Sequence, residues 1–221
     1  MKRHGPLHYN HIAGESLERL AALSDGIFGV AMTLLVLDLR TPAAGAIHSE
    51  LGLWHGLALL LPSLVTYMLS FLTAGIFWIS QQTQFNYMDR SDRNFTWIQI
   101  AFLFAVTLLP FSTAVLSAFI RYRAALLVYW FNIALLGAVF YWGWLYALRR
   151  GLVKDGTGPA VWLAIGQRAK MAQALYAFGA ALCAVNTFCS IGFIVLVQLN
   201  YAVGLFTGIG RESGETGVSI G

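Results

Sequence analysis

Long apolar stretches, separated by short polar segments, run through most of this 221-residue chain. A helix needs about 20 residues to cross the hydrocarbon core of a bilayer. The pattern therefore predicts an all-α integral membrane protein with six transmembrane helices. They cover about residues 18–39, 52–79, 96–119, 125–148, 169–187 and 190–209.

Two features complicate these spans. Pro62 and Pro110 fall inside the second and third, where a proline removes a helical hydrogen bond and neighbouring helices can satisfy the freed carbonyl. We therefore expect kinks at both positions. The segment CAVNTFCSIG offers only a weak break between the last two spans, at Asn186 to Gly192. A single long kinked helix is the alternative interpretation of this region.

The composition agrees with a membrane protein. Hydrophobic residues make up 58% of the chain and charged residues only 11%, whereas soluble domains have about 25% charged residues. We expect one transmembrane domain over residues 17–210. It lies between a retained polar N-terminal tail at 1–16, which lacks the features of a signal peptide, and a disordered polar tail at 211–221.

The basic residues predict the orientation. With six spans both termini lie on the same side, and eleven of the fourteen lysines and arginines fall there. Cytoplasmic loops carry the excess of positive charge in membrane proteins. Both termini are therefore predicted to be cytoplasmic. The eleven are Lys2, Arg3, Arg19, Arg90, Arg93, Arg149, Arg150, Lys154, Arg168, Lys170 and Arg211, and the other three are Arg40, Arg121 and Arg123.

The chain lacks the usual motifs of enzymes and cofactor sites. It shows no Ser/His/Asp grouping, HExxH motif, phosphate-binding loop or basic nucleic-acid motif. We expect no enzyme activity, no cofactor, no metal and no nucleic-acid partner. His4, His8 and His11 share a helical spacing, but a solvated tail does not preorganise metal ligands. A TVGYG-type filter is also absent, so side chains would have to select ions in any pore.

The first span, RLAALSDGIFGVAMTLLVLDL, has two different faces. At 100° per residue, Leu34 and Leu37 lie within about 40° of Val30, and Thr33 flanks this stripe at about 60°. Asp25 points roughly away from the stripe and needs polar partners, because an unpaired carboxylate in hydrocarbon costs several kcal/mol. On periodicity alone, the stripe is either ordinary helix packing or the lining of a pore.

A specific resemblance bears on this choice. Arg19, Ser24 and Asp25 match the R-x-x-x-F-S-D signature that opens the transmembrane-protein-175 family of potassium channels, with leucine in place of the phenylalanine. The likeness continues through YMLSFLTAGIFWISQQTQF and FLFAVTLLPFSTAVL, so it covers roughly the first half of the chain. A single six-span unit resembles the prokaryotic type, found in the plasma membrane.

The resemblance implies a homotetramer in the lipid bilayer, with the first helix lining a central pore for monovalent cations, potassium above all. It assigns the hydrophobic gate to Val30, Leu34 and Leu37 and the potassium preference to Thr33. It also implies a structural polar network. The members of that network would be Arg19, Ser24, Asp25, Trp78, Gln81, Gln82 and Gln99.

Two departures from the family pattern concern this network. Gln81 and Gln82 stand where relatives often have a histidine pair, and Gln99 stands where an asparagine is common. Glutamine can donate and accept hydrogen bonds but cannot titrate. Any histidine-based pH dependence at this position would therefore be absent.

Other function classes remain as alternatives. The first is a proton-conducting channel or a secondary transporter, and a further one is a membrane scaffold that transports nothing. Only Asp25, and marginally Asp38, can ionise within a span, whereas coupled transporters more often have several intramembrane ionisable sites. The shortage of such groups favours a channel over a transporter.

Overall fold

The computed structural model describes residues 16–182 and 187–209, and the regular elements in these ranges are helices. The predicted tails, with His4, His8 and His11, lie outside the described residues apart from Ser16. The α-helices are α2 Leu17–Leu35, α3 Glu50–Ala58, α4 Leu61–Asn86, α5 Arg93–Thr107, α6 Leu109–Ala118, α7 Arg123–Arg150, α8 Pro159–Ala181 and α9 Thr187–Ile209, and the short 3-10 turns are η1 Val36–Asp38 and η2 Ala44–Ala46.

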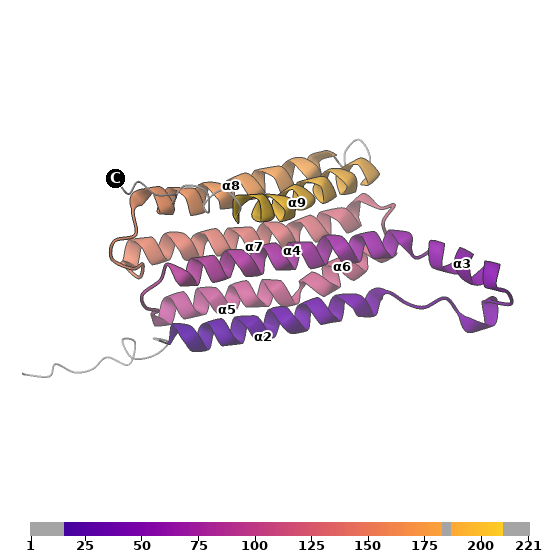
Figure 1. Ribbon diagram of the computed structural model, residues 1–221, viewed down its shortest axis with the longest axis horizontal. Coiled ribbons are helices and arrows are strands. Elements are labelled where there is room, and N and C mark those ends of the chain that lie inside the picture. The colour runs from indigo at the N-terminus through magenta and orange to yellow at the C-terminus, as the bar shows by residue number, and fades with distance from the viewer. Residues whose placement is uncertain (1–15, 183–186, 210–221) are drawn as a thin grey trace, which may run out of the picture.

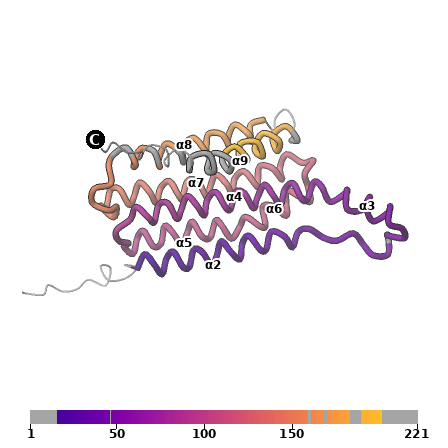
Figure 2. The backbone as a smooth tube through the Cα atoms, in the orientation of Figure 1, coloured from indigo at the N-terminus to yellow at the C-terminus, as the bar shows by residue number. Residues whose placement is uncertain are grey.

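The long helices pack as an antiparallel bundle in which successive passes run in opposite directions (Figure 1). Helix α2 packs on α4, α5 and α6, while α7 packs on α5, α6 and α8. Helix α9 packs on both α8 and α4. In the backbone trace α2 forms one edge of the bundle, and α8 and α9 form the opposite edge (Figure 2).

Among the described residues, four segments are long and apolar enough to cross a membrane. They are Leu17–Asp38, Leu61–Asn86, Arg93–Ala118 and Arg123–Arg150. The second begins at Leu61 instead of residue 52, and the third is divided into α5 and α6, because Pro62 and Pro110 lie in the first turns of α4 and α6. Proline is tolerated there since its missing N–H has no helical partner in any case. The expected kinks are therefore breaks, one between α3 and α4 and one between α5 and α6.

The last two helices form a pair, so the single long helix is wrong. The Ser190 hydroxyl donates to the carbonyl oxygen of Gly179, and the rings of Phe178 and Phe193 lie 5.3 Å apart. These contacts hold α8 and α9 side by side. Helix α8 begins at Pro159 instead of residue 169. Arg168 and Lys170, which the charge count assigned to the cytoplasmic side, therefore lie well inside a helix.

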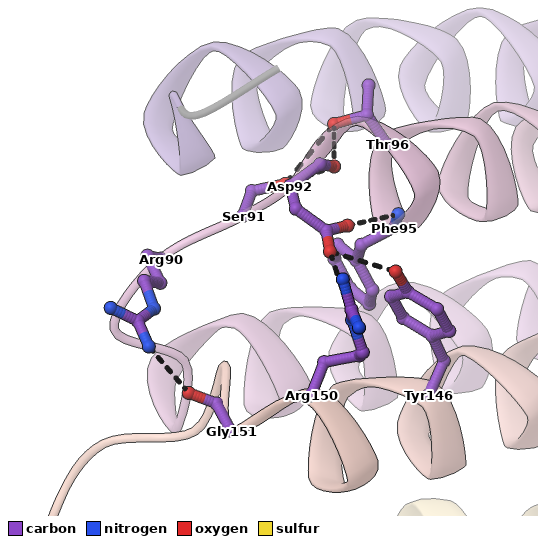
Figure 3. Close-up of polar contacts among 8 residues, drawn as sticks. All are labelled: Arg90, Ser91, Asp92, Phe95, Thr96, Tyr146, Arg150 and Gly151. Atoms are coloured by element: carbon purple, nitrogen blue, oxygen red, sulfur yellow. Dashed lines mark hydrogen bonds and ion pairs between the residues drawn. The ribbon is translucent and has the colours of Figure 1, made fainter. Parts of the chain in front are cut away.

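A polar cluster joins the loops at the end of the bundle where α2 begins (Figure 3). Asp92 caps α5 by accepting from the backbone N–H of Phe95 at 2.7 Å, and its other oxygen accepts from the Tyr146 hydroxyl at 2.8 Å. The Arg150 Nε lies 3.9 Å from the same oxygen. The loop after α4 and the end of α7 are thereby joined.

Candidate functional site

Helix α2 carries the predicted gate and begins at a capped N-terminus. The Ser16 side chain accepts from the backbone N–H of Arg19, which satisfies one of the donors left free at a helix start. One face of the helix is buried against α4, α5 and α6. That face consists of Leu20, Ser24, Phe28, Ala31 and Leu35.

The opposite face of α2 is open in the single chain. Val30 is 59% exposed, Leu34 44% and Leu37, in the turn that follows, 69%. These are the three residues of the predicted stripe, and the structure leaves them together on one unpartnered face. Exposed leucines are common in proteins, but a continuous apolar face marks a surface for lipid or another chain.

Thr33 lies exposed at the margin of this face. Its hydroxyl donates to the carbonyl oxygen of Val30 at 2.8 Å, within the helix. A hydroxyl oxygen has two acceptor positions, and this bond uses only its hydrogen. The Thr33 oxygen can therefore still accept a hydrogen bond or contact a cation.

A shallow apolar groove runs along the same face, with a volume of about 390 Å³. A Cβ added at Gly26 or Gly29 would meet no neighbouring atom within 4 Å. Small residues in membrane helices permit close approach of another helix. The groove is lined by Ala22, Leu23, Gly26, Ile27, Val30, Ala31, Leu34 and Thr107.

Asp25 connects α2 to α4. Its Oδ1 accepts from the Trp78 indole N–H at 2.8 Å and from the Gln82 amide at 2.6 Å. The two other signature residues do not join it. The Ser24 hydroxyl donates to the carbonyl oxygen of Leu20, and the Arg19 side chain makes no hydrogen bond or ion pair with another described residue.

A second, separate group of amides lies buried between α4 and α5. Gln81 donates to Gln99 at 2.8 Å, and Gln99 donates to Gln84 at 3.3 Å. The predicted network is thus two clusters, one around Asp25 and one around Gln99. Gln84 was not predicted, although its position three residues after Gln81 places it on the same helix face. The atoms at the two ends of this hydrogen-bonded chain, Gln81 Oε1 and Gln84 Nε2, are buried and have no hydrogen-bond partner among the described residues.

Comparison with known proteins agrees with the resemblance seen in the sequence. Residues 19–110 match the family described as endosomal/lysosomal potassium channel TMEM175. A potassium channel of Streptomyces collinus is 39% identical over 103 residues, which is 47% of this chain. The match spans only about half (48%) of that relative. A potassium channel of Chamaesiphon minutus is 28% identical over 84% of this chain and 93% of its own.

The similarity extends to a solved structure and to a mammalian protein. The crystal structure of a lysosomal potassium-selective channel TMEM175 homologue from Chamaesiphon minutus superposes with a TM-score of 0.74 at 27% identity, covering 85% of this chain and 96% of that one. The endosomal/lysosomal proton channel TMEM175 of Mus musculus is 27% identical over 48% of this chain and 22% of its own length. The helix arrangement and the first half of the sequence thus point to the same relatives.

Proposed function

Since residues 19–110 of this chain match the TMEM175 family, we propose that it forms a potassium-selective ion channel whose pore is lined by α2. The open apolar face of α2 carries the proposal. An apolar stripe at the edge of a bundle needs a partner, and four copies of α2 around one axis would bring the four stripes together. Helix α8, at the opposite edge, would then face outward to the lipid.

The proposed subunit crosses the membrane six times, with α8 and α9 as the fifth and sixth spans. The described basic residues Arg19, Arg90, Arg93, Arg149, Arg150 and Lys154 gather at the end where α2 begins. The positive-inside rule makes this end cytoplasmic. We place the channel in the plasma membrane of a prokaryote, with both termini inside the cell and no enzyme activity.

In the proposed mechanism, rings of Val30, Leu34 and Leu37 form the gate. A narrow apolar constriction excludes water and therefore blocks ions, and tilting or rotation of α2 would widen and hydrate it. The Thr33 hydroxyls, whose oxygens are free to accept, would replace part of the water shell of a potassium ion. Selectivity would then arise without a carbonyl filter.

Leu34→Ala tests the gate. In proteoliposomes loaded with potassium, we expect basal flux to rise about tenfold, which requires the barrier to fall by only about 1.4 kcal/mol. Leu127→Ala is the matched control, because Leu127 on α7 is similarly exposed, at 50%. If Leu34→Ala conducts like wild type while Leu127→Ala is also unchanged, the gate is elsewhere.

The same vesicles distinguish the alternative functions. The name of the mouse relative points to proton conduction, and a pH-sensitive dye measures that flux beside potassium and sodium. A channel gives flux without a counter-substrate and single-channel steps in a planar bilayer. Saturable exchange would instead indicate a secondary transporter, and a lack of any flux would support a scaffold.

A further inference from the structure

Lys170 is a cation in the interior of α8. It lies eleven residues after Pro159, about 17 Å along the helix. Its ammonium lies over the ring of Tyr141, 5.3 Å from the centroid. A cation over an aromatic face is held by the ring quadrupole. No carboxylate pairs with Lys170 in the part of the chain that the structure describes.

The depth of Lys170 follows from its neighbours on α7. Gly143, two residues beyond Tyr141, packs against the buried amide of Gln99. From Arg123, where α7 begins, to Tyr141 is eighteen residues, or about 27 Å, close to the thickness of the hydrocarbon core. Trp142 is 58% exposed at the same level, as expected of an interfacial aromatic belt. If the hydrocarbon core is measured from Arg123, Lys170 would lie where that core meets the headgroups.

The surroundings of Lys170 are apolar and open. Leu163 and Met171 on α8 are 62% and 64% exposed. Helix α8 packs on α7 and α9 at the edge of the bundle opposite α2. An anion dissolved in water would have to approach Lys170 past the exposed apolar side chains of α8. The phosphate of a lipid already lies at the depth of the Lys170 ammonium, and its acyl chains can lie along the helix. The flexible lysine stem can extend the ammonium toward that phosphate.

We propose that Lys170 binds the headgroup of an anionic phospholipid at the lipid-facing seam between α7 and α8. Tyr141 is a positioning residue, whose ring holds the ammonium at the seam. Trp142, next to Tyr141, would lie beside the bound lipid at the boundary between hydrocarbon and headgroups. The site does not depend on the proposed channel function. A lysine near an anionic lipid surface contributes enough binding energy for about a fivefold change in affinity.

The experiment measures binding of phosphatidylglycerol to the full chain in neutral detergent by native mass spectrometry, with phosphatidylcholine as the reference lipid. We expect Lys170→Gln to weaken phosphatidylglycerol binding about fivefold and to leave phosphatidylcholine binding unchanged. Lys170→Arg should keep the affinity within about twofold, because the charge is retained. Tyr141→Leu should weaken binding and Tyr141→Phe, which keeps the ring, should not.

Arg149→Gln is the control, since Arg149 is an exposed cation near the end of α7. An equal loss in Arg149→Gln would show diffuse attraction and overturn the site. Unchanged phosphatidylglycerol binding in Lys170→Gln would overturn it as well. Competition by millimolar inorganic phosphate would identify a site for soluble anions instead of a lipid. Should Lys170→Gln elute as aggregate, Lys170→Arg and the two Tyr141 variants decide the question.

Discussion

The phenol of Tyr129 lies at the centre of a buried hydrogen-bonded chain between helices. It accepts from the Ser70 hydroxyl at 3.3 Å and lies 3.2 Å from the Thr73 hydroxyl. Thr73 uses its own hydrogen on the carbonyl oxygen of Leu69, so Tyr129 is the donor to Thr73. Gln198 on α9 also donates to Thr73. We predict that Tyr129→Phe destabilises the subunit.

The expected loss is about 2–4 kcal/mol. Phenylalanine keeps the ring, which is fully buried, so that no cavity forms. Two hydrogen bonds disappear, each of about 0.6 kcal/mol in membrane proteins. The Ser70 hydroxyl is also left without its acceptor at a buried position, and an orphaned donor costs about 1–3 kcal/mol. Thr73 keeps the Gln198 amide as a donor, so its share of the loss is small.

Reversible unfolding in mixed micelles, with a rising mole fraction of dodecyl sulfate and far-ultraviolet circular dichroism, measures this loss. Tyr122→Phe makes the same chemical change at a residue that is 67% exposed. We expect it to stay within about 0.5 kcal/mol of wild type. Equal unfolding midpoints for Tyr129→Phe and Tyr122→Phe would refute the reasoning.

A double variant separates the bond from other effects of the substitution. Ser70→Ala together with Tyr129→Phe removes both partners. The Thr113 hydroxyl, which lies 2.7 Å from the Ser70 oxygen, then still donates to the carbonyl oxygen of Leu109. The loss should therefore be smaller than the sum of the two single losses, by about 0.5 kcal/mol or more. Strict additivity would mean that the two hydroxyls do not interact.

Two further predictions concern carboxylates that accept hydrogen bonds from other helices or from a helix start. Asp25→Ala leaves the Trp78 and Gln82 donors without an acceptor and should lower the unfolding free energy by about 1–3 kcal/mol, whereas Asp25→Asn keeps an oxygen and should cost less. The mixed-micelle assay would contradict this if both variants lost the same amount. Asp92→Ala should cost about 1–2 kcal/mol through the lost cap of α5 and the lost Tyr146 bond, and Asp92→Asn about half as much. Equal thermal midpoints for Asp92→Ala and wild type would show that the cap is dispensable.

The sequence alone predicted the features that depend on local pattern. The lengths of the apolar stretches placed the first, third and fourth spans near the bounds found in the structure. The 100° rotation per residue of an α-helix separated Asp25 from the face that carries Val30 and Leu34. The signature that includes Arg19 and Asp25 pointed to the same family whose model matches residues 19–110. These features are determined within a few turns of one helix, where spacing along the chain converts directly into direction in space.

Other features were decided only by the tertiary structure. Asp25 pairs with Trp78 and Gln82 instead of Arg19, because its partners depend on how α2 lies against α4. The helix wheel could not show which face of α2 would be buried, since both a lipid-facing and a packed helix can carry leucines. The prolines at 62 and 110 start helices instead of bending them.

The buried chain around Tyr129 is the clearest case of a feature beyond the sequence pattern. Its members come from five helices, and the bond between Thr73 and Gln198 joins residues 125 positions apart. Serine, threonine and tyrosine are unremarkable in any one apolar span. Only the packing of α4 between α6, α7 and α9 brings their hydroxyls within hydrogen-bonding distance, because side-chain partners depend on the relative rotation and depth of whole helices, which no local spacing encodes.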